Sequence, residues 1–125
     1  MVERARKRLS KYGSRVRVQV GDSNAIDAPD ASYDAVFDFG IIHHIPDWRG
    51  ALAEVHRVLK PGGRFYAEEV LRRFIVHPVT RRLLEHPLED RFDAADFADA
   101  LEASGLAVLA KEQMLGSVAW FAARK

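Results

Sequence analysis

The sequence predicts an α/β fold in which an open, doubly wound sheet of about five strands ends in a C-terminal β-hairpin. Helical and strand-like apolar periodicities alternate along the chain, as they do in folds that wind helices around a largely parallel sheet. Residues 33–42, YDAVFDFGII, are apolar on both faces, which is typical of a strand buried under helices. With 125 residues, the chain is expected to form one domain over residues 1–125.

The first elements are predicted to be a helix, a strand and a loop. Apolar residues recur at helical spacing over residues 2–12, and Gly13 stands where such a helix would end. Residues 15–20, RVRVQV, alternate strictly between polar and β-branched side chains, which predicts a strand. The polar residues 23–32 then predict a loop.

The middle of the chain carries clear helix boundaries. Asp47 is expected to cap a helix that ends at the Pro-Gly-Gly of residues 61–63, because proline cannot continue a helix. Residues 64–70 predict the next strand, and a weaker pattern predicts a short helix near residues 79–85.

The C-terminal part is predicted to be a helix followed by a hairpin. Asp93 is expected to cap the helix, and Gly105 to close it. Residues 106–115 and 117–125 then predict two paired strands with Gly116 at the turn.

Composition excludes several kinds of function. The chain has 19 Lys and Arg and 18 Asp and Glu, and this net charge of +1 gives no electrostatic reason to bind nucleic acid or an anionic membrane. It has no cysteine, so disulfides, thiol nucleophiles and thiolate metal sites are excluded. No apolar run approaches the ~20 residues that span a bilayer, so a cytoplasmic protein is expected.

Ligands of open α/β sheets bind at the carboxyl ends of the strands. The residues predicted to lie there are Asp22, Ser23, Asp38, Phe39, Gly40, His43, His44, Glu68 and Glu69. Asp22 either accepts hydrogen bonds from a ligand's amino group or only caps the turn that it begins.

The two adjacent histidines point to opposite sides of an extended chain, so no metal site is predicted. Two interpretations stay open for His43 and His44. In one, a histidine acts as a general base or orients a substrate. In the other, one ring packs in the core with backbone partners and the other is solvated.

Other catalytic motifs are missing from the sequence. It has no Gly-x-Ser-x-Gly elbow and no phosphate-binding loop, which argues against hydrolases and nucleotide triphosphatases. Glu54 and Arg57 are expected to form a plain surface ion pair on their helix.

Several motifs occur together: GD at residues 21–22, YDAV at 33–36, HHI at 43–45 and RVLKPGG at 57–63. In this combination the chain resembles the class I S-adenosylmethionine-dependent methyltransferases, most closely the small-molecule branch related to ubiquinone and menaquinone biosynthesis. The resemblance implies a Rossmann-like sheet, S-adenosylmethionine as cofactor and a small-molecule methyl acceptor.

The resemblance also implies roles for the residues at the strand ends. Asp22 and Ser23 would lie beside the adenine of the cofactor. Residues 38–40, which are Asp38, Phe39 and Gly40, would border the ribose and methionine portion. His43 and His44 would face the substrate.

The resemblance spans nearly the whole chain but only the C-terminal portion of the family fold, which implies a truncated member. The first two family strands, with the glycine-rich turn and an acidic residue that holds the ribose, have no counterpart in the sequence. Hydrogen bonds to charged groups contribute ~1.5–3 kcal/mol each, so the loss of two or three predicts cofactor binding weaker by roughly three decades.

Two functions therefore stay open: a small-molecule methyltransferase, and a non-catalytic methyltransferase-like module for interaction or assembly. The missing strands lie in the middle of the family sheet, which leaves three possible arrangements. The remaining strands pair directly, two copies join along their exposed edges, or a partner chain completes the sheet. The favoured arrangement is a homodimer.

Overall fold

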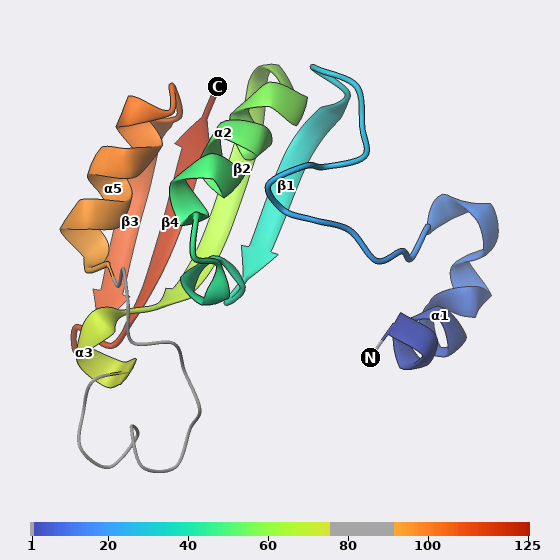
Figure 1. The fold of residues 1–125 in the computed structure, drawn as a ribbon, viewed down its shortest axis with the longest axis horizontal. Coiled ribbons are helices and arrows are strands. Elements are labelled where there is room, and N and C mark those ends of the chain that lie inside the picture. The colour runs from blue at the N-terminus through green and yellow to red at the C-terminus, as the bar shows by residue number, and fades with distance from the viewer. Residues whose placement is uncertain (1, 76–91) are drawn as a thin grey trace.

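The computed structural model describes residues 2–75 and 92–125 (Figure 1). Its sheet has four strands in the order β1-β2-β4-β3. Strand β1 (Tyr33–Phe39) is parallel to β2 (Leu59–Val70), whereas β4 (Val118–Arg124) is antiparallel to both β2 and β3 (Ala107–Met114). The predicted open α/β sheet and its C-terminal hairpin are confirmed, with four strands in place of about five.

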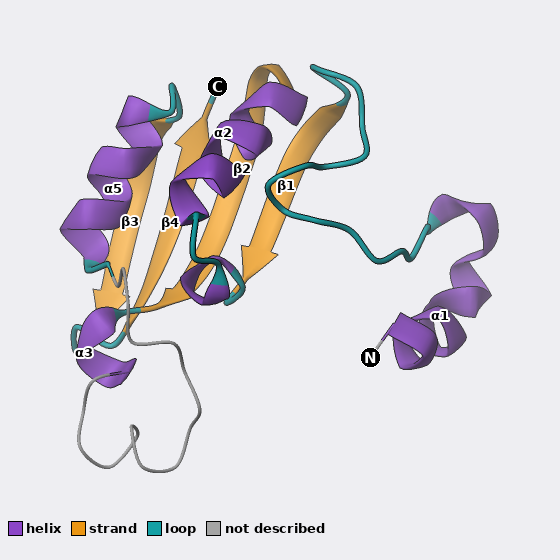
Figure 2. Cartoon of the chain, in the orientation of Figure 1, coloured by secondary structure: helices purple, strands orange, loops and turns teal. Residues whose placement is uncertain are grey.

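Helices α2 (Trp48–Val58) and α5 (Ala94–Ala103) lie against one face of this sheet (Figure 2). Both begin where the sequence predicts. The Asp47 carboxylate accepts from the backbone N–H of Gly50 at 3.0 Å, and Asp93 forms a reciprocal capping box with Asp96. A short helix, α3 (Arg72–Ile75), follows β2. The helix predicted near residues 79–85 lies outside the described residues.

The core lies between these helices and the covered face of the sheet. Four aromatic rings form its centre, with Phe97 of α5 in the middle: ring centroids lie 5.9 Å away in Trp48, 4.8 Å away in Phe92 and 4.8 Å away in Phe121. Phe97 is fully buried. Helix α2, β4 and α5 are therefore held together by one aromatic cluster.

The N-terminal helix α1 (Val2–Leu9) forms as predicted and continues into a 3-10 segment, Ser10–Arg15. Gly13, within this segment, has a φ of +59°, which places a kink there, beyond the end of the α-helix at Leu9. None of the residues in these two elements is buried. The apolar side that the sequence shows is therefore only partly covered by the described part of the chain: Val2, Ala5 and Leu9 are half-buried and Tyr12 is exposed.

The strand predicted at residues 15–20 is wrong, because residues 16–20 have no strand partner within the described structure. A strand exists only through hydrogen bonds to a neighbouring strand, so alternation alone cannot create one. Val20, on the predicted apolar side, is 80% exposed. Direct pairing between this segment and residues 33–39, one of the three possible arrangements, does not occur in the described structure.

The turn at residues 61–63 differs in detail from the prediction. Helix α2 ends at Val58, and β2 begins at Leu59, before the Pro-Gly-Gly sequence. The pairing of β1 with β2 shifts register here, from Tyr33 opposite Leu59 to Ala35 opposite Arg64. The extra residues therefore form a bulge at the start of the strand.

The second face of the sheet is open within the described structure. Burial alternates along β2, so Tyr66 and Glu68 point to this open face while Phe65 and Glu69 point to the core. Aromatic side chains of β1 and β4 share the open face. Strand β1 is also an edge strand, because it pairs only with β2 among the described strands. None of the described helices is long and apolar enough to cross a lipid bilayer.

Candidate functional site

The carboxyl ends of the parallel strands β1 and β2 meet at one end of the sheet, where the chain turns sharply after β1. Gly40 makes the turn with a φ of +67°, and its N–H donates to the carbonyl of Glu68 at 2.7 Å. Residues Ile42–His44 then form a single 3-10 turn. The predicted residues 38–44 and 68–69 are therefore brought together.

A buried carboxylate, Glu69 of β2, ties this turn to the sheet. Its Oε1 accepts from the N–H of Ile42 at 2.8 Å. Its Oε2 lies 2.6 Å from Nδ1 of His43 and accepts from the His43 N–H at 3.3 Å. The side chain of Glu69 is completely shielded from solvent. Burial raises the pKa of Glu69, and the hydrogen bonds from Asp38 and from backbone N–H groups work against that rise.

Asp38 of β1 lies beside Glu69 in the same buried cluster. Its Oδ1 accepts from the N–H of Ile41 at 3.1 Å. Burial, together with the hydrogen bond and the charge of Glu69, raises the pKa of Asp38 to about 8. Its Oδ2 meets no donor among the described residues, and its neighbour Glu69 is an acceptor. A proton on Asp38 resolves this, since Asp38 then donates to Glu69.

The histidines differ from the extended-chain expectation. Because they lie in a 3-10 turn, their rings do not point to opposite sides; the centroids of His43 and His44 are 4.1 Å apart. His43 is buried and His44 is exposed, as one of the two interpretations predicts. The Nδ1 partner of the buried ring, however, is the side chain of Glu69 rather than a backbone group.

The loop before β1 forms the second wall of the site. Asp22 Oδ1 accepts from the N–H of Asn24 at 2.8 Å, which is the turn-capping role that the sequence allows. The side-chain amide of Asn24 in turn donates to the backbone carbonyl of Asp47 at 2.7 Å. This hydrogen bond places residues 22–24 against the N-terminus of α2.

The predicted ion pair between Glu54 and Arg57 is confirmed, with 2.7 Å between Arg57 Nε and Glu54 Oε1, and both side chains also bind the loop before β1. Arg57 donates to Glu54 and also to the carbonyl oxygens of Ile26 and Ala28, both at 2.9 Å. Glu54 accepts from the N–H of Ile26 at 2.8 Å, and its bonds with Arg57 and with that N–H lower the pKa of Glu54 to about 2. The two side chains hold the loop on α2. The sequence gives no signal for this, because the loop carbonyls belong to the backbone.

A cavity of about 390 Å³ lies between this loop, β1 and α2. Three of the predicted site residues line it: Ser23, Asp38 and Phe39. The other lining side chains are apolar and include those of Ile26 and Ile41. The two segments that the sequence predicted to form the site lie before and after residues 25–37 in the chain, and both line this cavity.

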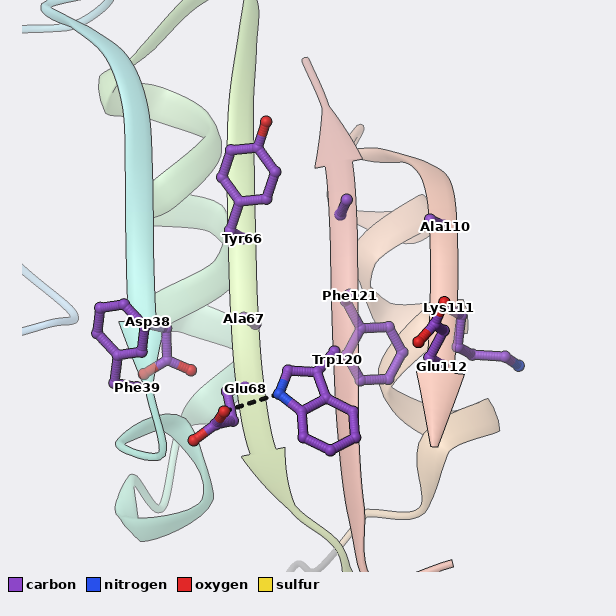
Figure 3. A pocket seen from close by; sticks show the side chains of 11 residues that line it. Asp38, Phe39, Tyr66, Ala67, Glu68, Ala110, Lys111, Glu112, Trp120 and Phe121 are labelled. Atoms are coloured by element: carbon purple, nitrogen blue, oxygen red, sulfur yellow. Dashed lines mark hydrogen bonds between the residues drawn. The ribbon is translucent and has the colours of Figure 1, made fainter. Parts of the chain in front are cut away.

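A second hollow, of about 250 Å³, lies on the open face of the sheet (Figure 3). Trp120 donates from Nε1 to Glu68 Oε2 at 2.7 Å across its floor. The rings of Phe37 and Tyr66 stack 5.1 Å apart beside it, and Phe39 is 73% exposed. These aromatic side chains are neighbours and form one exposed patch, whereas exposed apolar side chains on most protein surfaces are scattered singly.

Comparisons with known proteins agree with one another. A family model described as a methyltransferase domain matches residues 1–67. The ubiquinone/menaquinone biosynthesis C-methyltransferase UbiE of Methylobacterium nodulans is 43% identical over 60 residues, which are 47% of this chain and 23% of that protein. The chain thus spans less than a quarter of this curated relative.

Solved structures share the fold over nearly the whole chain. A SAM-dependent methyltransferase from Aquifex aeolicus covers 98% of this chain with a TM-score of 0.74 and 21% identity, and 62% of its own length is matched. A Haloferax volcanii complex of the Trm112 methyltransferase activator with a methyltransferase covers 99% of this chain, with a TM-score of 0.83 and 18% identity; 66% of that chain is matched. About a third of each neighbour therefore has no counterpart in these 125 residues.

Proposed function

Because the chain belongs to the class I S-adenosylmethionine-dependent methyltransferase family, we propose that it forms part of an enzyme that transfers a methyl group from S-adenosylmethionine to a small molecule. The cavity of about 390 Å³ carries this proposal. Its polar lining, Ser23 and Asp38, comes from the loop before β1 and from the end of β1. These are the two segments to which the family resemblance assigns the cofactor.

The lining residues fit one end of the cofactor. Apolar walls with a few polar groups are typical of sites for flat rings, and Ile26, Phe37 and Ile41 provide such walls. Asp22 adjoins Ser23, and a carboxylate can accept further hydrogen bonds beside the one from Asn24. The glycine-rich turn and the ribose-binding carboxylate of the family have no counterpart in the sequence. The chain therefore provides the adenine side of the site.

S-adenosylmethionine, when bound, supplies an electrophilic methyl group on a sulfonium sulfur. The contribution of this chain is orientation and the exclusion of water. Asp22 and Ser23 hold the adenine end, and residues 38–40 shape the cavity beside the remainder. His43 and His44 lie on the side assigned to the methyl acceptor, where His44 is exposed and His43 is buried behind it. A histidine accepts a proton only if the acceptor has to lose one.

Mapping the binding of S-adenosylhomocysteine, the reaction product, tests this assignment. We expect the backbone amide resonances of Ser23 and Phe39 to shift in a saturable way in ¹H–¹⁵N spectra, because both residues line the cavity. Amides of Val118 and Arg124, at the two ends of β4, serve as internal controls and should stay in place. Shifts confined to β4, or no shifts at all, would contradict the assignment.

A further polypeptide segment at the edge of β1 completes the site, and a second copy of the chain or a partner chain can supply it. Support comes from the unpaired edge of β1 and from the exposure of Phe37 and Phe39, at 60% and 73%. An exposed strand edge with apolar side chains is a template for pairing. The identity of the methyl acceptor therefore depends on that added segment as well as on this chain.

We expect the chain to form a homodimer at high protein concentration in sedimentation experiments. A charge on an edge strand opposes pairing, so Phe37→Lys should shift the population to monomer. Leu109→Lys is the matched control: it places the same charge on β3, at the other edge of the sheet, where Leu109 is 46% exposed. A wild-type chain that stays monomeric at high concentration would rule out the homodimer and leave the partner chain.

A second candidate function is a non-catalytic methyltransferase-like module for interaction or assembly. The observation that favours it is the open sheet face, where Tyr66 and Trp120 are 37% and 39% exposed. Such a module needs the open face and the β1 edge but not the cavity beside Ser23. Absence of S-adenosylhomocysteine binding together with dimer formation would favour this candidate.

A further inference from the structure

Glu69 is the most completely buried acidic side chain among the described residues. Its side chain is bound by three groups of the turn after β1: the N–H of Ile42, the N–H of His43 and Nδ1 of His43. A buried carboxylate is tolerated only when donors replace the water that it loses. The turn and Glu69 therefore depend on each other.

The contact with His43 fixes where the imidazole proton lies. An ionised carboxylate only accepts hydrogen bonds, and Oε2 is 2.6 Å from Nδ1 of His43. Nδ1 must then carry a proton. The tautomer of a histidine is set by the partner of one ring nitrogen, so Glu69 determines the state of the whole ring.

Asp38 supports this arrangement from β1. It holds the same turn through the N–H of Ile41, and it donates to Glu69 when it is protonated. The titratable groups that meet in the cluster are Asp38 of β1, His43 of the 3-10 turn and Glu69 of β2, and the exposed His44 ring lies 4.1 Å from the His43 ring. Two adjacent buried carboxyl groups share one proton more readily than they carry two negative charges.

We propose that Glu69 is a positioning residue, which fixes the turn at residues 41–43 and holds His43 with a proton on Nδ1, while Asp38 assists as a neutral donor. The inference rests on the proposed function only in placing this turn at the mouth of a methyl-transfer site. Its consequence is that the orientation of His43 is set by the fold before any ligand binds.

The state of the His43 ring can be measured by ¹⁵N NMR of the imidazole nitrogens in the 125-residue chain at neutral pH. His43→Asn assigns the signals among the five histidines. In the wild-type chain we expect Nδ1 to be protonated. A spectrum in which Nδ1 of His43 is unprotonated would overturn the proposal without any further variant.

Glu69→Gln tests the positioning role. The amide oxygen can replace Oε1, which accepts from the Ile42 N–H, and the amide nitrogen then replaces Oε2 and donates to Nδ1 of His43. We expect the proton of His43 to move from Nδ1 to Nε2, and the hydrogen-exchange protection of the His43 amide to fall at least tenfold, because that N–H then faces a donor. Unchanged ring signals and unchanged protection in a folded Glu69→Gln chain would overturn the proposal.

Two further variants make the result specific. Glu68→Gln changes the neighbouring residue, whose side chain bonds to Trp120 on the opposite face, and it should leave the His43 signals unchanged. Asp38→Asn should retain the wild-type tautomer, since its amide is a neutral donor to Glu69. If Glu69→Gln does not fold, the protonation of His43 Nδ1 in the wild-type and Asp38→Asn spectra still tests the proposal. None of these signals depends on cofactor binding, so failure of the proposed function would not alter them.

Discussion

Asp38→Asn is expected to make the chain more resistant to unfolding at pH 8 and to flatten the pH dependence of its stability. The folded-state pKa of Asp38, about 8, lies above its ordinary value of 3.8. The stabilising contribution of such a group is fully present below pH 3.8 and is lost as the pH rises through 8. Asparagine keeps the neutral donor but does not titrate.

The size of the effect follows from the two pKa values. Between pH 5 and pH 8, the unfolding free energy of the wild type should fall by about 3 kcal/mol more than that of Asp38→Asn. Urea denaturation at both pH values measures this difference. Asp34→Asn is the matched control: Lys60 lowers the pKa of Asp34, so this exposed group titrates below the range. Parallel profiles for wild type and Asp38→Asn would contradict the shared-proton arrangement.

Phe97→Ala is expected to cause the largest loss of stability among simple core substitutions, about 3–5 kcal/mol. Phe97 is fully buried, and its ring lies within 4.8 to 5.9 Å of three other aromatic rings. Removing it leaves a cavity between α2, α5 and β4. A loss of this size is a large fraction of the stability of a small domain, so the variant should unfold at markedly lower urea concentration.

The same substitution at Phe39 provides the control. Phe39 is 73% exposed on the open face, so Phe39→Ala should change the unfolding free energy by less than about 1 kcal/mol. Equal losses in the two variants would mean that the open face is covered in solution and that its aromatic residues belong to a second core. That outcome would contradict the open face described above.

The sequence correctly predicted the elements whose formation depends on residues close together in the chain. Asp47 and Asp93 cap helices because their carboxylates reach backbone N–H groups within a few residues, and the pattern shows this directly. The hairpin at residues 107–124 likewise needs only a turn and two alternating segments. The segment at residues 15–20 has an equally strong alternation but no neighbouring strand, and no local signal reveals the lack of a partner.

Only part of the candidate site was predicted, because some of its contacts join residues that are far apart in the sequence. Motif positions identified Ser23, Asp38 and Phe39, which the fold brings to one cavity. The sequence did not reveal that Glu69 bonds to His43, because the two residues are 26 positions apart and meet only after β1 and β2 pair. Nor could it show that Arg57 binds loop carbonyls, which carry no side-chain signature.

Calorimetric titration with S-adenosylhomocysteine tests whether the 125-residue chain carries the adenine side of a methyltransferase site. We expect weak but saturable binding that Ser23→Trp abolishes, because a large side chain at Ser23 fills the cavity. Ser117→Trp, in the hairpin turn away from the cavity lining, should bind like the wild type. No saturable heat from a folded wild-type sample, or equal binding by Ser23→Trp, would contradict the claim that this chain carries the adenine side of a methyltransferase site.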